Sequence, residues 1–121
     1  MPPEVDAQLS GRYAELTERL REAVLGATRG AATDQSLRHA VEARSASFGG
    51  RGGPRADVPA ALAPFVDKVA QHAFAVTDGN VRALGEAGYS EQAIFEITAS
   101  AALGAGFSRL ERGLAALRGQ V

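Results

Sequence analysis

The C-terminal stretch 90–117 constrains the fold most, because its small and apolar residues recur on two separate faces of one predicted helix. The first face consists of Ile94, Ile97, Thr98, Ala101 and Ala105. The second face alternates between four- and three-residue steps and consists of Leu103, Phe107, Leu110, Leu114 and Leu117. A helix with two apolar faces is covered from two sides. One cover is the core of the chain itself, and the other is either the N-terminal helix folded back or a neighbouring subunit.

Two further helices are predicted in the N-terminal part of the chain. The first begins near Asp6 or Ser10 and runs to about Gly26, with an apolar stripe formed by Leu9, Tyr13, Leu16, Leu20 and Val24. The second begins at an N-cap supplied by Thr33 or Asp34. Its apolar face consists of Leu37, Ala40, Val41 and Phe48.

Two more helices are predicted between the glycine-rich stretch and residue 90. One begins near Pro59, a favourable first-turn residue, and runs to about Val76. Its apolar face consists of Leu62, Phe65, Val66, Val69, Ala73 and Val76, with Phe74 on the opposite side. A short helix then starts at Thr77 or Asp78 and ends at Gly88, where glycine favours a left-handed cap, and Ser90 caps the last helix.

The whole pattern predicts an all-α protein, a compact bundle of about five helices in a single domain over residues 1–121. Residues 6–48 hold the N-terminal helices, residues 49–58 form a loop, and residues 59–121 form the helical core. The loop is rich in glycine and arginine but lacks both the preceding strand and the Gly-Lys-Ser/Thr ending of a phosphate-binding loop, so we interpret it as a linker.

Composition removes several classes of function. The 13 basic and 14 acidic residues are interspersed and give a net charge of −1, so no basic face for nucleic acid is expected. The absence of cysteine excludes disulfides, thiolate metal sites and thiol redox catalysis. His39 and His72 lack the spacing of a metal site, and we expect neither a metal nor another cofactor. No segment has the length of a membrane span or a signal peptide, so a cytoplasmic protein is expected.

The segment TDGNVRALGEAGYSEQAIFEITASAALGAGFSRLERGLAAL, residues 77–117, resembles the all-helical domain of the carboxymuconolactone decarboxylase and alkylhydroperoxidase D family. The resemblance extends from about Leu62 to Leu117, and AGYS followed by AALGAGF-x-R-L is its most specific part. It implies a helical bundle of the alkylhydroperoxidase D type that assembles into homo-oligomers. The second apolar face, Leu103 to Leu117, is the expected contact between subunits.

The family's peroxidases carry a CxxCxxxH motif just before this segment, and the resemblance places its cysteines at Ala73 and Val76 and its histidine at Asn80. A peroxidase of this type needs a thiolate nucleophile and a resolving thiol, so thiol peroxidase activity is not expected. The decarboxylase branch uses acid–base chemistry without sulfur. The missing cysteines therefore leave chemistry on a lactone or small organic acid open.

Five residues near the equivalent region are candidates for such chemistry. His72 suits proton transfer near neutral pH, Asp78 would orient it, and Lys68 would steady a substrate carboxylate. Thr77 and Asn80 are candidates for substrate binding. A structural interpretation is also open, with His72 as a partly buried helix residue, Asp78 as a plain N-cap and Lys68 as a solvated side chain.

Two hypotheses for the function follow. The first is a redox-inactive member of the family that acts as a structural or binding module, in a homo-oligomer or with a related family protein. The second is a cofactor-free acid–base enzyme that uses His72 with Asp78. Two other polar residues are assigned more simply. His39 is expected on the surface, and Glu96 either meets a neighbouring subunit or is solvated.

Overall fold

The computed structural model describes residues 11, 13–51 and 55–119, and this part of the chain is all-helical, with no strand. Its five α-helices are α2 (Ala14–Leu25), α3 (Gln35–Phe48), α4 (Ala63–His72), α5 (Asp78–Glu86) and α6 (Glu91–Leu117), and the 3-10 turn η2 (Ala73–Ala75) follows α4. The all-α class predicted from the sequence is therefore confirmed. Among the described residues, every helix is too short or too polar to cross a membrane.

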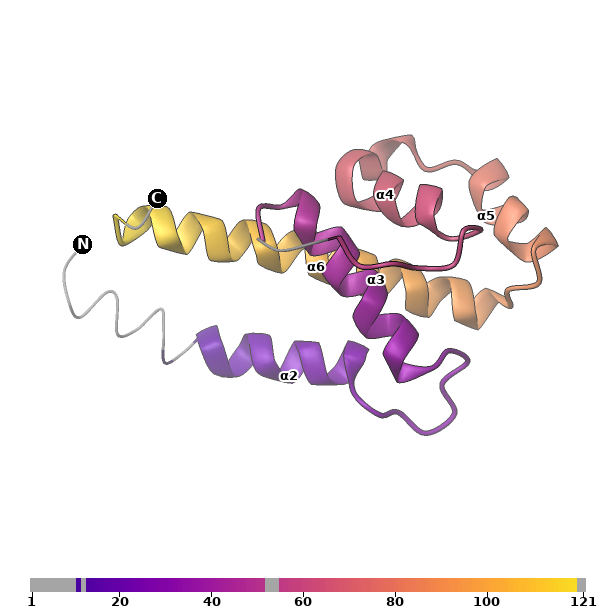
Figure 1. Cartoon of the computed structure of the whole chain (residues 1–121). Helices are drawn as coiled ribbons and strands as arrows, with labels where there is room; N and C mark the ends of the chain where they lie inside the picture. Colours follow the sequence, from indigo (N-terminus) through magenta and orange to yellow (C-terminus); the bar gives the residue numbers. More distant parts are fainter. Residues whose placement is uncertain (1–10, 12, 52–54, 120–121) are drawn as a thin grey trace.

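Helix α6 forms the long axis of the molecule, and the other helices are arranged along it (Figure 1). α3 crosses α6 and makes its most extensive contact, while α4 and α5 lie over the first half of α6 (Figure 1). α2 runs beside the second half of α6 in the opposite direction (Figure 1). The first half of α6 is therefore covered by three helices, while its second half lies beside α2 and the segment that follows α3.

The apolar core lies where α3, α4, α5 and the first half of α6 meet. It consists of Val41, Leu62, Phe65, Val66, Val69, Leu84, Ile94, Ile97 and Ala101. The first predicted face of the last helix supplies three of these residues, and the predicted face of the third helix supplies four. α2 contributes none, because its one buried apolar residue, Leu25, lies outside this cluster.

Small residues of α6 bring α3 close to it. Gly104 lies against the backbone of Glu42 in α3, where an added Cβ would collide with the carbonyl group. The buried hydroxyl of Ser45 in α3 donates a hydrogen bond to the carbonyl oxygen of Ala101 in α6. The Ala/Gly-rich composition of the last helix therefore serves helix packing at short range.

Two of the predicted helix starts are confirmed by their capping bonds. The Ser90 hydroxyl accepts a hydrogen bond of 3.1 Å from the N–H of Ala93 at the start of α6. The Thr77 hydroxyl accepts from the N–H of Asn80, so Thr77, and not Asp78, is the N-cap of α5. Asp34 occupies the cap position of α3 but makes no capping bond with its side chain. At the end of α5, Gly88 has a positive φ of 104°, which agrees with the predicted left-handed glycine.

The third helix is shorter than predicted. α4 begins at Ala63, with Pro64 rather than Pro59 in its first turn, and ends at His72. The chain then tightens into η2, and the backbone of His72 leaves the helical region with φ −145° and ψ 53°. Because the helix is interrupted there, Ala73, which was predicted on the buried face, is exposed.

The predicted stripe of the first helix does not face the core. Tyr13, Leu16 and Leu20 are 43%, 51% and 49% exposed. α2 ends at Leu25, next to the predicted Gly26, while its predicted start near Asp6 or Ser10 and its residue Leu9 lie outside the described residues.

Candidate functional site

The residues proposed from the sequence meet at the junction of α4 and α5. The side-chain oxygen of Asn80 accepts hydrogen bonds from the Lys68 ammonium at 3.0 Å, the Thr77 N–H at 2.9 Å and the Thr77 hydroxyl at 3.1 Å. Three of the five candidates are therefore joined. The bonds complete the capping box of α5 and tie α5 to α4, so the Asn80 oxygen is already occupied by the protein.

His72 and Asp78 are not joined in this way. His72 is exposed at the end of α4, and its ring meets the ring of Phe74 edge-on at a centroid distance of 5.9 Å. Phe74 is itself 90% exposed. Asp78 is exposed in the first turn of α5, and no hydrogen bond or ion pair links it to His72 in the part of the chain that the structure describes. Neither residue lines the grooves that follow.

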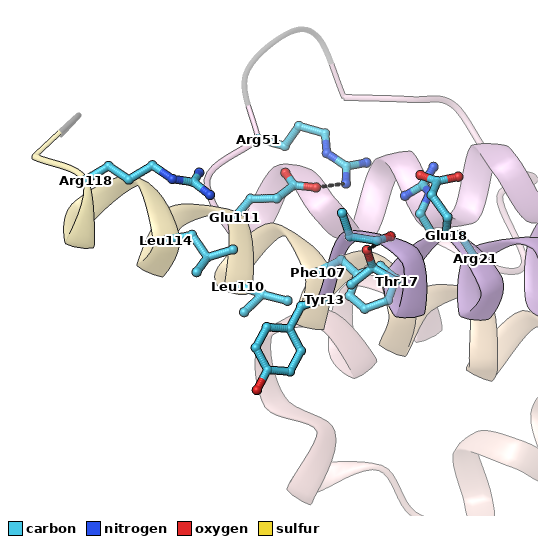
Figure 2. Close-up of a pocket in the computed structure, with 11 residues that line it drawn as sticks. Tyr13, Thr17, Glu18, Arg21, Arg51, Phe107, Leu110, Glu111, Leu114 and Arg118 are labelled. Atoms are coloured by element: carbon cyan, nitrogen blue, oxygen red, sulfur yellow. Dashed lines mark hydrogen bonds and ion pairs between the residues drawn. The ribbon is translucent and has the colours of Figure 1, made fainter. Parts of the chain in front are cut away.

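A groove of about 500 Å³ opens between α2 and the second half of α6 (Figure 2). We call it the α2/α6 groove. Its apolar walls include Tyr13, at the N-cap of α2, and three residues of the predicted second face, Phe107, Leu110 and Leu114. The charged residues of its lining carry both signs and are Glu18, Arg21, Arg51, Glu111 and Arg118. α2 therefore folds back along this side of α6 but leaves it partly open (Figure 1).

The second face of α6 is exposed to different degrees. Leu103 is buried within the protomer, with 8% of its surface exposed, so it is removed from the predicted subunit contact. Phe107 and Leu114 are half-buried, while Leu110 and Leu117 are 42% and 58% exposed. The part of the predicted contact that remains open to a partner therefore begins at Phe107.

A chain of ion pairs links three residues that line the α2/α6 groove to buried Glu42 of α3. The buried carboxylate of Glu42 accepts hydrogen bonds from Arg21 at 3.0 Å and from Arg51 at 2.6 Å. Arg51 also pairs with Glu111 of α6 at 3.0 Å, as Figure 2 shows. Burial lowers the pKa of the Arg51 guanidinium, but its hydrogen bonds to Glu42 and Glu111 raise it above the ordinary value. Arg51 therefore stays charged and fixes one wall of the groove.

A second, smaller cavity lies at the other end of α2, where the segment 26–34 passes the first half of α6. It has a volume of about 340 Å³, and we call it the α2–α3 hollow. Its apolar walls are formed by Ala23, Val24, Ala31, Phe95 and Ala99. Its polar lining includes Arg29, Arg38 and Glu96.

Glu96 holds the segment before α3 in place. Its carboxylate accepts hydrogen bonds from the N–H groups of Ala32 and Thr33, each 2.9 Å, from the Thr33 hydroxyl and from the Gln92 amide. Burial raises the pKa of Glu96, but these hydrogen bonds outweigh it and lower the pKa to about 2. The sequence-based assignment of Glu96 to a subunit contact or to solvent is therefore wrong, because its carboxylate is an internal anchor.

Arg38 completes the same anchor from α3. Its guanidinium donates to the carbonyl oxygens of Val24, Gly26 and Thr33, and it lies 4.0 Å from Glu96. Arg38 thus satisfies carbonyl groups at the end of α2 that the helix itself leaves unpaired. His39, its neighbour in sequence, is exposed as predicted.

Sequence reasoning missed the buried charges of α3. Arg38, Val41, Glu42 and Ser45 have the three- and four-residue spacing of one helix face, and all four are buried. A search for apolar residues alone skips this face, because two of its members are charged. In the part of the chain that the structure describes, no group of three or more histidine, aspartate or glutamate side chains is arranged to hold a metal ion.

Comparison of the chain with known proteins identifies no relative. No family model, no curated protein and no solved structure matches the chain.

Proposed function

We propose that the chain is a self-associating helical module, a structural or binding protein without thiol chemistry, whose subunit contact lies along α2 and the second half of α6. The observation that carries this proposal is the pair of half-exposed apolar stripes on adjacent helices. Tyr13, Leu16 and Leu20 supply one stripe, and Leu110 and Leu117 supply most of the exposed surface of the other. Apolar side chains gathered in this way mark an interaction surface more often than an ordinary monomer surface.

A second copy of the chain is the occupant that fits this surface best. The α2/α6 groove is lined by two carboxylates, Glu18 and Glu111, and by the guanidinium groups of Arg21, Arg51 and Arg118. In a twofold contact the same surface meets itself, so it needs both signs of charge, which this lining has. Two antiparallel helices from each subunit would then form a four-helix layer, a common way to bury two such stripes.

The same proposal includes membership of this chain in the carboxymuconolactone decarboxylase-like family. It is supported by the residues AGYS and AALGAGF-x-R-L. Members of that family form homo-oligomers, and the absence of cysteine removes the thiol chemistry of its peroxidases. The second hypothesis, acid–base catalysis by His72 with Asp78, stays a prediction, and no observed contact between these two residues favours it.

The test uses the α2 stripe, because its exposed residues can be changed with little effect on the folding of one protomer. Leu16→Asp combined with Leu20→Asp places two carboxylates in the proposed contact. We expect the mass measured by light scattering to fall to that of a single chain, while the helical circular dichroism spectrum is kept. Phe74→Asp is the matched control, since Phe74 is 90% exposed in the turn between α4 and α5, does not line the α2/α6 groove, and should leave the mass unchanged.

Two results would contradict the proposal. The first is a wild-type protein that remains a single chain at all concentrations. The second is an oligomer whose mass the α2 variant leaves unchanged, because the contact would then lie elsewhere.

A further inference from the structure

The α2–α3 hollow is a cavity that the proposed subunit contact does not use. It lies at the C-terminal end of α2, whereas the α2/α6 groove involves residues from the N-terminal end of α2 and the C-terminal half of α6. The two cavities share no lining residue. Its volume of about 340 Å³ is at the small end of the range for ligand sites, which is roughly 300–1,000 Å³.

The walls of the hollow suit a compact apolar group. Val24 and Ala23 come from α2, Ala31 comes from the following segment, and Phe95 and Ala99 come from α6. The alanines leave space instead of filling it. Phe95 is 72% exposed at the edge, so its ring offers an aromatic face to anything that enters.

The charges that line the hollow favour an anion. Arg29 is exposed and makes no hydrogen bond or ion pair in the part of the chain that the structure describes. Arg38 and Glu96 are opposite charges and cancel each other, so the lining has a net charge of +1. The Glu96 carboxylate is saturated by its four donors and therefore does not compete for Arg29.

Arg38 also retains hydrogen-bonding capacity. A guanidinium has five N–H donors, and Arg38 makes four hydrogen bonds within the described chain. One of the two N–H groups of Nη2 is left over, because Nη2 donates only to the carbonyl oxygen of Gly26. The Arg38 side chain is only 3% exposed, and a buried donor of this kind is stabilised by a charged acceptor.

We propose that the α2–α3 hollow binds a small carboxylate that has a compact apolar or aromatic body. The carboxylate meets Arg29 and the free N–H of Arg38, and the apolar body lies against Val24, Ala99 and Phe95. The single negative charge of the ligand balances the single excess positive charge of the lining. The proposal is independent of the proposed function, because it uses none of the residues of the subunit contact.

The experiment measures binding of phenylacetate and of its neutral counterpart phenylacetamide by titration of the 15N-labelled full chain, followed by NMR. We expect saturable binding of phenylacetate with a Kd of about 1 mM or tighter, about tenfold tighter than phenylacetamide. The backbone signals that shift should be those of residues 28–33 and 92–99. A Kd for phenylacetate weaker than about 10 mM, equal binding of acid and amide, or shifts confined to another region would overturn the proposal.

Two pairs of variants locate the site. Arg29→Gln should weaken phenylacetate binding about fivefold or more and leave phenylacetamide binding unchanged, while Arg82→Gln, an exposed arginine of α5, should change neither. Ala99→Leu fills the hollow and should abolish binding of both compounds, whereas Ala102→Leu, the same change at an exposed position of the same helix, should not. Unchanged binding in both Arg29→Gln and Ala99→Leu would show that the compounds bind elsewhere.

The same titration of the Leu16→Asp, Leu20→Asp variant separates the two proposals. Binding should persist in a single chain, since neither leucine lines the hollow. Loss of self-association with retained binding therefore supports both proposals. Failure of one leaves the result for the other intact.

Discussion

The role of Glu96 is set by its surroundings in the fold and differs from the role expected for a glutamate on a helix surface. In the sequence it is a polar residue next to exposed Phe95, but the fold surrounds its carboxylate with four donors. Two of these are backbone N–H groups of the segment that leads into α3. One carboxylate of α6 therefore fixes the connection between α2 and α3.

The stability of the protein should depend on pH through this carboxylate. The pKa of Glu96 is lowered from 4.5 to about 2 in the folded chain, so the ionised form is bound more strongly by the native state than by the unfolded state. Its contribution is complete above about pH 4.5 and is lost as the pH falls towards 2. The free energy of unfolding of the wild type should therefore fall as the pH is lowered through this range. In Glu96→Gln we expect this fall to be smaller by about 3 kcal/mol, measured by urea denaturation at a series of pH values.

Glu86→Gln is the matched control for the pH experiment. Glu86 is exposed near the end of α5 and makes no hydrogen bond or ion pair in the described part of the chain. Its variant should keep the acid sensitivity of the wild type. If Glu96→Gln also keeps it, the carboxylate of Glu96 is not the group that couples folding to pH.

His72 is the residue on which the alternative function depends. Its side chain is exposed and meets only the ring of Phe74 edge-on, so His72→Gln should change the free energy of unfolding by no more than about 0.5 kcal/mol. If His72 is a general base, the same change lowers turnover of a lactone or small organic acid at least about 100-fold. Melting temperature and specific activity are measured on one preparation. Undiminished turnover would remove His72 from any catalytic role.

At the scale of the elements, the crossing of α3 and α6 depends on Gly104. A methyl group at this position would meet the carbonyl oxygen of Glu42 and lie 3.0 Å from its carbon atom. Backbone atoms in the middle of a helix cannot move aside without displacing the whole helix. The close contact of α3 with α6 therefore requires the absence of a side chain at residue 104.

Gly104→Ala should lower the free energy of unfolding by about 2 kcal/mol, although alanine favours helix formation by roughly 1 kcal/mol over glycine. Gly106→Ala is the matched control on the same helix, because a methyl group there meets nothing within 4 Å. It should raise the free energy of unfolding by up to about 1 kcal/mol. Thermal and urea denaturation measure both variants, and equal effects of the two changes would contradict a close helix contact at Gly104.

The features that could be predicted from the sequence are those that depend on neighbouring residues. Ser90 and Thr77 cap helices through residues three positions away, and Ile94, Ile97 and Ala101 share a face by helical period alone. These interactions are local, so the sequence contains all of their participants. The same holds for part of the candidate site, since Thr77 and Asn80 belong to one capping box.

The features that escaped prediction depend on partners far along the chain. Glu42 is buried because Arg21 and Arg51 reach it from two other segments, and Glu96 is buried because the segment before α3 lies over it. The apolar stripe of α2 was predicted from its spacing, but whether that stripe packs against another helix depends on how all the helices are arranged. Leu103 is buried for the same reason, although its spacing equals that of exposed Leu110 and Leu117.

For the whole molecule, the arrangement along α6 separates a well-packed part from an open part. The first half of α6 supplies the core together with α3, α4 and α5. The second half lies beside α2 and the segment after α3, and Arg109 bonds to Ala70 of α4, yet apolar side chains of α2 and α6 remain partly exposed there. Contact with a second copy would cover the exposed apolar side chains of this part, as α3, α4 and α5 cover those of the first half of α6.

If this contact is part of the native structure, folding and association are coupled, and thermal stability depends on protein concentration. We expect the melting temperature of the wild type to rise by about 2 °C for each tenfold increase in concentration, because mass action favours the associated folded state. The Leu16→Asp, Leu20→Asp variant should melt at a single temperature at every concentration, and the Phe74→Asp control should behave like the wild type. Circular dichroism melts over a hundredfold range of concentration measure all three proteins. A wild type whose melting temperature does not change over that range would show that one chain is stable without the contact, and the exposed stripes of α2 and α6 would then need another partner.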